Sequence, residues 1–375
     1  MPKGALKQLN ECTVYYQDAL VGRVGLQDDS RFLFQYDASF MEKGVSISPL
    51  HLPLEPKLFE APFSPFQGNF GVFDDSLPDG WGSLVFDRYL RKAGIAPESL
   101  NQVQRLALIG STGRGALEYQ PDLGDRGKLK QIPLSELAEQ IMNLYDAEAY
   151  TDEGIETIFR YSGSSGGARP KAFVVADDEE WLVKFPASVD PSDVGKQEYE
   201  YSILARACGL EMTETRLFDG RYFGTKRFDR TPEEKVHTIS AAGLLHADYR
   251  IPSLDYRDLL IACRVISQDI QEAYKLFRLM VFNVVIGNRD DHAKNFSFQL
   301  KGQNWKLSPV YDLLPCSGFG GQHTTTIQGQ GDPRRADLVA CGKEVGLAEA
   351  KMNAIIDEIL AQCKSENMHR PDLKL

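Results

Sequence analysis

From residue 11 to about residue 75, short apolar stretches are separated by Gly, Pro and Asp. This pattern predicts strands at TVYY, LVGRVGL and RFLFQY, with a turn at Gly22 and Gly25. From Trp81 the apolar residues recur at helical spacing, and the stretch ends at Gly94, which predicts a helix with a C′ glycine. The N-terminal part is therefore expected to be an α/β unit.

A second strand-rich block follows a charged, Gly-rich segment at residues 121–133, which is typical of a linker or surface loop. After a helix to about residue 147, the pattern predicts the strands KAFVVA and EEWLVKFP, the helix QEYEYSILARACGL and paired strands in RLFDGRYFGTKRFD. The order strand, strand, helix, strand, strand is that of a small nucleotide-covering lobe.

Helices dominate from Asp255 onward. Asp269, with Glu272 three residues later, is a capping signal for a long apolar helix. The apolar stripe of this helix predicts core positions, and another amphipathic helix is expected at about residues 347–363. The predicted core positions of the long helix are Ile270, Tyr274, Phe277 and Val281.

Composition narrows the class of protein. The 375 residues are 42% hydrophobic and 25% charged, which is enough apolar material for a folded core. The net charge of −11 opposes direct binding to a nucleic-acid backbone. Six scattered cysteines indicate a reducing cytoplasm, and the longest apolar run, residues 279–286, is too short to cross a membrane. We expect a cytoplasmic protein without a membrane segment.

The candidate chemistry begins directly after the long apolar helix. Asp290 and Asn295 are five positions apart, the spacing that protein kinases use for a carboxylate that accepts the substrate proton and an amide that binds metal. Asp291 lacks this spacing. A predicted hairpin with its turn at Gly302 leads to Asp312, where a second metal-binding carboxylate is expected. The spacing therefore favours phosphoryl transfer from a metal-bound nucleotide.

A kinase must also hold the triphosphate. The glycine loop (residues 163–170, GSSGGARP) contains Gly163, Gly166 and Gly167, whose backbone N–H groups can approach phosphate oxygens. It matches neither the Walker A motif nor the G-x-G-x-x-G fingerprint. Lys184, in the strand that follows, is the candidate phosphate-pairing lysine.

Two further groups complete this prediction. Glu198, or alternatively Glu200, on the next helix is expected to orient the lysine. The strand end GTKRFDR resembles the connection between kinase lobes, so Lys226, Arg227 and Phe228 are expected to line the adenine site.

Taken together, these residues resemble the HipA family of bacterial toxin kinases. Five motifs carry the resemblance, namely LPDGWG at 77–82, IGSTGRGALEYQP at 109–121, SGSSGGARPKA at 162–172, IGNRDDHAKNFSF at 286–298 and LSPVYDLLP at 307–315. They occur in order over nearly the whole chain. The resemblance implies an α+β, two-lobed protein-kinase-like fold with an N-terminal α/β subdomain (1–125), a kinase N-lobe (150–228) and a mostly helical C-terminal lobe (229–375).

The resemblance also implies roles for individual residues. Asp290 would be the proton acceptor, Lys184 the phosphate-pairing lysine, and Asn295 and Asp312 the Mg²⁺ ligands. Ser164 aligns with an autophosphorylated serine of the family, although Ser165 stays an alternative. The remaining ATP contacts would be Gly166, Gly167, Ala168, Arg169, Pro170, Lys171, His292, Ala293, Lys294 and Asn295.

The implied partners are a helix-turn-helix antitoxin of the HipB type and a protein substrate, usually an aminoacyl-tRNA synthetase. DNA would be bound only through the antitoxin, which agrees with the acidic charge of the chain. Three alternatives stay open: a small-molecule kinase, a non-catalytic pseudokinase in a repressor complex, and a metal hydrolase at Asp290, Asp291 and His292. The hydrolase is disfavoured because the sequence has no H-E-x-x-H motif.

Overall fold

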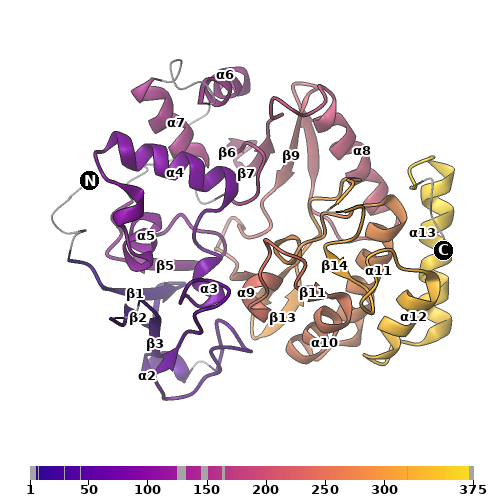
Figure 1. The fold of residues 1–375 in the computed structure, drawn as a ribbon, viewed down its shortest axis with the longest axis horizontal. Coiled ribbons are helices and arrows are strands. Elements are labelled where there is room, and N and C mark those ends of the chain that lie inside the picture. The colour runs from indigo at the N-terminus through magenta and orange to yellow at the C-terminus, as the bar shows by residue number, and fades with distance from the viewer. Residues whose placement is uncertain are drawn as a thin grey trace. The chain divides into compact units, whose positions relative to one another are not determined.

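The computed structural model describes residues 6, 8–28, 30–42, 44–124, 132–144, 151–162, 165–318 and 320–370. Figure 1 labels the helices and strands along the chain. The chain divides into two compact units. The first comprises Met1–Lys196 and Glu214–His237, and the second comprises Gln197–Thr213 and Thr238–Leu375. The three-part division predicted from the sequence stays a prediction.

The first unit contains an antiparallel sheet in the order β4-β3-β2-β1-β5. Its inward-facing residues are large and apolar, and Val14, Val24 and Phe34 are fully buried. The helices that follow in the sequence are α2 to α5 with one 3₁₀ turn. The bounds are β1 Glu11–Tyr16, β2 Ala19–Leu26, β3 Phe32–Tyr36, α2 Ala38–Met41, β4 Phe59–Glu60, α3 Gly71–Asp74, α4 Gly80–Lys92, η1 Pro97–Ser99, α5 Gln102–Ile109 and β5 Leu117–Gln120.

The three predicted N-terminal strands form, but the predicted turn at Gly22 and Gly25 is wrong. Both glycines lie within β2, and the β1–β2 turn is at Gln17 and Asp18, whose φ angles are 48° and 61°. Gly22 is needed for another reason. A Cβ there would lie 2.1 Å from the carbonyl oxygen of Gln35 on β3, so the glycine permits close strand approach.

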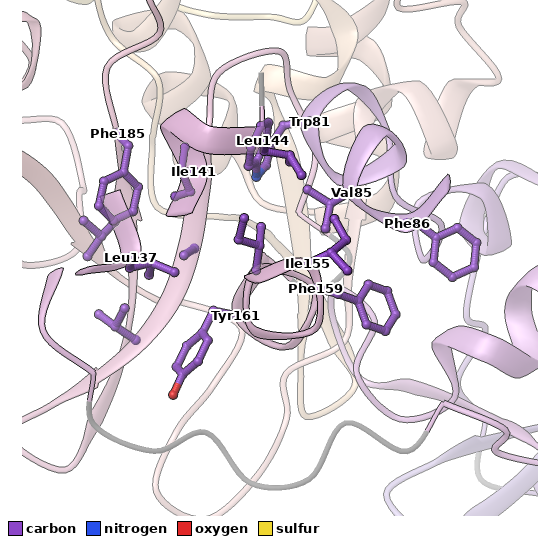
Figure 2. Packing of buried hydrophobic residues seen from close by; sticks show 14 of the residues in the cluster. Trp81, Val85, Phe86, Leu137, Ile141, Leu144, Ile155, Phe159, Tyr161 and Phe185 are labelled. Carbon is purple, nitrogen blue, oxygen red and sulfur yellow. The ribbon is translucent and has the colours of Figure 1, made fainter. Parts of the chain in front are cut away.

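A second antiparallel sheet in the first unit has the order β6-β7-β9-β8. It packs with α4, α6 and α7 around one apolar cluster, drawn in Figure 2. Within it the rings of Tyr89 and Phe159 stack with centroids 3.9 Å apart. Helix α4 ends as predicted before Gly94 (φ 67°), whereas α7 was not predicted. The bounds are α6 Leu134–Leu144, α7 Asp152–Ser162, β6 Lys171–Ala176, β7 Glu179–Lys184, β8 Thr215–Phe218 and β9 Tyr222–Lys226.

The second unit is mostly helical, with a small sheet in the order β10-β12-β13 and a parallel pair of β11 and β14. The predicted hairpin forms, with Gly302 (φ 64°) between β12 and β13. The bounds are α8 Val194–Ala207, which begins in the first unit, β10 Thr238–Ser240, α9 Ala241–Leu245, β11 Leu254–Asp255, α10 Tyr256–Ser267, α11 Ile270–Ile286, η2 Ala293–Asn295, β12 Ser297–Lys301, β13 Asn304–Leu307, β14 Thr325–Thr326, α12 Arg335–Lys343 and α13 Glu349–Ser365.

Helix α11 begins where the sequence predicts. The Asp269 carboxylate caps it by accepting a hydrogen bond from the N–H of Gln271 (2.9 Å). Glu272 is buried and accepts from the N–H of Leu307 on β13 (2.9 Å), so it joins the helix to the sheet. Of the predicted core positions, Phe277 and Val281 are fully buried, while Ile270 and Tyr274 are half-buried. None of the described helices has the length and apolarity needed to span a membrane.

Candidate functional site

The loop of residues 288–297 connects α11 to β12 in the second unit. Gly287 ends α11 in the left-handed conformation (φ 76°), which turns the chain into the loop. Asp290 is exposed at the start of this loop. The side-chain amide of Asn295 donates to the Asp290 carbonyl oxygen (2.7 Å), so the five-residue spacing brings these two residues together. The catalytic role of Asp290 stays a prediction.

Asp291 has a different environment from its neighbour. Its side chain is fully buried and accepts hydrogen bonds from the hydroxyl of Tyr256 (3.0 Å) and from the N–H groups of Thr324 (2.9 Å) and Thr325 (3.2 Å). Nδ1 of His323 lies 2.9 Å from the same carboxylate. A carboxylate with these partners joins chain segments and cannot reach a substrate from this position. The geometry therefore favours Asp290 over Asp291 as the reactive carboxylate.

Asp312 lies in a loop that buried amides connect to the 288–297 loop. It has a positive φ of 59°. The side-chain amide of Asn288 donates to the Asp312 carbonyl oxygen and to Oδ1 of Asn283, both at 3.1 Å. Asn283 in turn donates to the Tyr256 hydroxyl (3.0 Å), and that hydroxyl donates to Asp291. One hydrogen-bond chain thus fixes both loops. Sequence reasoning missed it, although an asparagine within an apolar helix was a usable signal.

Tyr311 adds another connection between the same loops. Its hydroxyl lies 2.5 Å from Oγ of Ser297 and donates to the carbonyl oxygen of Lys294 (2.7 Å). The Lys294 ammonium group is 4.1 Å from the ring centroid of Tyr249, and His292 accepts from the Lys294 N–H (3.2 Å). Ala293 is buried. The residues predicted to contact ATP in this loop are therefore held in one local arrangement.

The side-chain oxygens of Asn295 and Asp312 in the second unit are ligands that suit a hard divalent cation. Asn295 uses its NH₂ group on the Asp290 carbonyl oxygen, so its Oδ1 is oriented as an acceptor. Asp312 supplies a carboxylate on the adjoining loop. Mg²⁺ prefers such oxygen ligands and usually completes its shell with water and substrate phosphates. Among the described residues, no group of three His, Cys, Asp or Glu side chains is placed to hold a metal ion.

The predicted phosphate-pairing lysine lies on β7 in the first unit. Lys184 is half-buried, and its ammonium group is 5.7 Å from the ring centroid of Phe223 on β9. The two candidate glutamates on α8 belong to the second unit and differ in exposure. Glu198 is buried whereas Glu200 is exposed, which favours Glu198 for a specific role. The pairing of either glutamate with Lys184 stays a prediction.

The glycine loop is described from Ser165 onward, and Gly163 and Ser164 lie outside the described residues. Ser165 is buried, and its Oγ has no hydrogen-bond partner among the described residues. Gly166 and Gly167 are half-buried, Ala168 is exposed, and Pro170 and Lys171 are buried. The exposed Arg169 forms a bidentate ion pair with Asp190 (2.9–3.0 Å), and these hydrogen bonds lower the pKa of Asp190.

The three residues predicted for the adenine site lie at the end of β9. Lys226 pairs with Glu179, and Phe228 is half-buried. The N–H of Arg227 donates to the carbonyl oxygen of Glu180 (2.9 Å), and its guanidinium is 4.2 Å from the Phe173 ring centroid. Through these contacts Arg227 stabilises the sheet. Its role in nucleotide binding stays a prediction.

Asp229 is a buried acid that sequence reasoning missed. Burial would raise its pKa, but the guanidinium groups of Arg227 (2.8 Å) and Arg230 (3.0 Å) lower that pKa well below the usual range. Asp229 also accepts from the N–H of Gly115 (2.9 Å), and Arg230 donates to the carbonyl oxygens of Gly113 (2.9 Å) and Gly115 (2.7 Å). This network joins the 109–121 motif to the end of β9.

Comparison with protein-family models finds two matches. The model of the HipA N-terminal domain matches residues 12–120, and the model of the HipA-like C-terminal domain matches residues 163–366, which is more than half of the chain. Two relatives come from Sinorhizobium fredii. The chain is 26% identical to "Putative kinase Y4dM" over 76% of this chain and 72% of the relative, and 27% identical to "Putative kinase Y4mE" over 82% and 77%.

A solved structure extends the likeness to the fold. It is the HipA chain of the Shewanella oneidensis MR-1 toxin-antitoxin complex of HipA, HipB and its operator DNA, with a TM-score of 0.69 and 19% identity. The match covers 96% of this chain and 92% of that chain. The predicted α+β, kinase-like fold is therefore confirmed.

Proposed function

Because the chain belongs to the HipA family, we propose that it is an ATP- and Mg²⁺-dependent kinase that phosphorylates a Ser or Thr hydroxyl of a protein. The observation that carries the proposal is the contrast within the 288–297 loop. Asp290 is exposed beside the Asn295 amide, while the adjacent Asp291 is buried and holds the loop. A reactive carboxylate needs access to the substrate, and a rigid loop positions it.

In this proposal each residue has one task. Asp290 orients the substrate hydroxyl and accepts its proton as the phosphoryl group is transferred. Asn295 and Asp312 would hold Mg²⁺, and Lys184 with Lys171 and the glycine loop would bind the triphosphate. Bound Mg²⁺ supplies charge neutralisation for the phosphates. The buried amide chain through Asn288 keeps the loops of Asp290 and Asp312 together.

The proposed substrate is an aminoacyl-tRNA synthetase, and the proposed partner is a helix-turn-helix antitoxin. The solved relative of similar fold was determined with HipB and operator DNA, which supports a partner of this kind. The net charge of −11 also favours a basic partner at any DNA site. We expect DNA binding by the complex and none by the isolated chain.

Autophosphorylation of Ser164 is proposed as the means of self-inactivation. A phosphate would add a charge of about −2 to a loop that must bind triphosphate, so repulsion should displace the loop. The burial of Ser165 supports Ser164 as the modified residue. Mass spectrometry after incubation with Mg·ATP should find the phosphate on Ser164 in wild type and on neither serine in Asp290→Asn. An active enzyme with an unmodified loop would contradict this.

Labelled ATP added to a cell lysate tests the kinase itself. Asp290→Asn should lower substrate phosphorylation by about 10²-fold or more, because it removes the proton acceptor. The matched control is Asp258→Asn, an exposed acid on α10. Labelling of a small molecule in place of a protein would indicate a small-molecule kinase. Equal labelling by wild type and Asp290→Asn would contradict the assignment, and no labelling by wild type would favour a pseudokinase.

A further inference from the structure

The 77–82 turn, LPDGWG, contacts the glycine loop within the first unit. The Asp79 carboxylate accepts a hydrogen bond from the N–H of Gly167, and the N–H of Trp81 donates to the Gly167 carbonyl oxygen (2.9 Å). Both peptide groups around Gly167 therefore have partners in this turn. The two segments are 88 residues apart in the sequence, so local folding cannot produce the contact.

The position of Asp79 makes this contact unusual. Asp79 is the N-cap residue of α4, and an aspartate there normally accepts from N–H groups of the first helical turn. In the described structure of this helix, the Asp79 side chain makes no such capping bond. The carboxylate is directed to the glycine loop instead, so a favourable local interaction is replaced by a long-range one.

Glycines on both segments allow the approach. A Cβ at Gly80 would lie 2.4 Å from the carbonyl oxygen of Gly167, and a Cβ at Gly82 would lie 2.1 Å from that of Ser165. A Cβ at Gly166 would lie 2.8 Å from Oδ1 of Asp79. A Cβ under 3 Å from backbone atoms is not tolerated, so Gly80 and Gly82 are needed for the close fit of the turn and the loop, and Gly166 leaves room for the Asp79 carboxylate.

Trp81 connects the loop to the core. Its indole N–H lies 3.1 Å from both Oγ of Ser162 and the carbonyl oxygen of Lys171, the residues that flank the glycine loop. The ring is buried in the apolar cluster with Val85 and Ile155 (Figure 2). One side chain thus contacts both ends of the loop while packing holds it in place.

From these contacts we infer that Asp79 and Trp81 are positioning residues that hold the glycine loop ready for the triphosphate of ATP. The inference rests on the proposed kinase function. A glycine-rich segment loses more conformational entropy on ordering than a segment of other residues. Contacts that already order the loop before ATP binds reduce the entropy lost on binding. Trp81 donates to the carbonyl oxygens of Gly167 and of the flanking Lys171. Phosphate is an acceptor and does not compete for these oxygens. Most of the contact can therefore persist when nucleotide binds.

Equilibrium binding of Mg·ATP to the full chain tests the inference. Asp79→Ala should raise the Kd for Mg·ATP about tenfold, the size expected for a lost hydrogen bond to a charged group. Asp79→Asn keeps an acceptor oxygen and should restore the Kd to within about threefold of wild type. In steady state, Asp79→Ala should raise KM for ATP and leave kcat nearly unchanged. The matched control is Glu98→Ala, an exposed acid near the end of α4.

Hydrogen exchange without nucleotide supplies a second measurement. Peptides that cover residues 165–171 should exchange faster in Asp79→Ala than in wild type, Asp79→Asn or Glu98→Ala. Trp81→Phe keeps an aromatic ring in the core and removes the indole N–H, so it should also speed exchange in these peptides. An unchanged exchange rate in both variants would overturn the inference.

The possible binding results separate the two proposals. If wild type binds Mg·ATP and Asp79→Ala binds it equally well, positioning by Asp79 is wrong while the kinase proposal stands. Tighter binding by Asp79→Ala would also overturn positioning, because it would show that the carboxylate competes with phosphate for the Gly167 N–H. Wild type that binds no Mg·ATP would overturn both proposals.

Discussion

Asp79 in the first unit and Asp291 in the second are two carboxylates that do similar work in different surroundings. Each accepts a hydrogen bond from backbone N–H groups of a loop. Asp291 is fully buried and has four groups around it, contributed by Tyr256, His323, Thr324 and Thr325. Asp79 is half-buried, and its contact with the loop is the N–H of Gly167.

The difference suits what each loop is proposed to do. A buried carboxylate surrounded by donors is costly to break, because its loss leaves several polar groups unsatisfied at once. The Asp79 carboxylate is half-buried, so water can replace the Gly167 N–H as its partner at a lower cost. The first arrangement fixes the 288–297 loop, which is proposed to be catalytic. The second holds the glycine loop, which is proposed to bind nucleotide, less firmly. Mutation of buried and half-buried acids tests whether this difference in stability exists.

The largest expected effect is that of Asp291→Ala. Removing this carboxylate should lower the free energy of unfolding by about 3–5 kcal/mol, because it leaves buried donors without an acceptor. Urea titration followed by circular dichroism measures it. Asp290→Asn, at the exposed neighbouring position, is the control and should stay within about 0.5 kcal/mol of wild type. A loss for Asp291→Ala no larger than that of the control would show that burial does not distinguish the two loops.

Mutation of Asp229 tests whether the loss of stability depends on which unit holds the carboxylate or on how deeply the carboxylate is buried. It is buried like Asp291 but lies in the first unit with Asp79. Asp229→Ala leaves the guanidinium groups of Arg227 and Arg230 without their shared partner, so we expect a loss of about 3 kcal/mol. In a Trp305→Phe background the remaining tryptophans, at 81 and 181, report on the first unit by fluorescence. If Asp229→Ala lowers the unfolding free energy by less than about 1 kcal/mol, burial alone does not set the loss, and the unit in which the carboxylate lies matters more.

His237, also in the first unit, should make the folded state less stable at acid pH. Burial lowers its pKa from 6.5 to about 4, although Nε2 is hydrogen-bonded to the carbonyl oxygen of Ile47 (2.8 Å). Between these values the unfolded chain binds more protons than the folded chain, so stability falls as the pH falls through this window. From pH 7 to pH 5 the loss due to His237 should be about 2 kcal/mol.

The variant His237→Gln isolates this contribution. Glutamine keeps a nitrogen donor and does not titrate in this range, so the fall in unfolding free energy between pH 7 and pH 5 should be smaller by about 2 kcal/mol. The same Trp305→Phe background reports on the first unit. An unchanged pH dependence in His237→Gln would assign the acid sensitivity to other groups.

The comparison also shows how far the sequence could predict the structure. Signals that act over a few residues were sufficient for α4 and its end at Gly94, for the start of α11 at Asp269 and for the hairpin at Gly302. The five-residue spacing of Asp290 and Asn295 also brought these residues together. These features depend on backbone conformation within a short segment, which residue type strongly constrains.

Long-range contacts were not predictable in the same way. The roles of Asp79 and Asp229 depend on partners far along the chain, and Gly22 has the appearance of a turn residue although it faces a neighbouring strand. Helix α7 was missed because Gly154 in its first turn weakens the helical signal, while its apolar face packs on α4. Tertiary packing decides such cases, and local propensity is a weak guide to it.

The smallest expected effect is that of Asp79→Ala on global stability. Its hydrogen bond from the Gly167 N–H is half-buried and has a charged acceptor, so the free energy of unfolding should fall by about 1.5 kcal/mol. Urea titration in the Trp305→Phe background, with fluorescence from Trp81 and Trp181, measures it, and Glu98→Ala is the control. A loss of 3 kcal/mol or more, comparable to that of Asp291→Ala, would mean that the glycine loop is fixed as firmly as the 288–297 loop. A small loss together with faster exchange at residues 165–171 would instead show that Asp79 stabilises one conformation of the loop and contributes little to the fold.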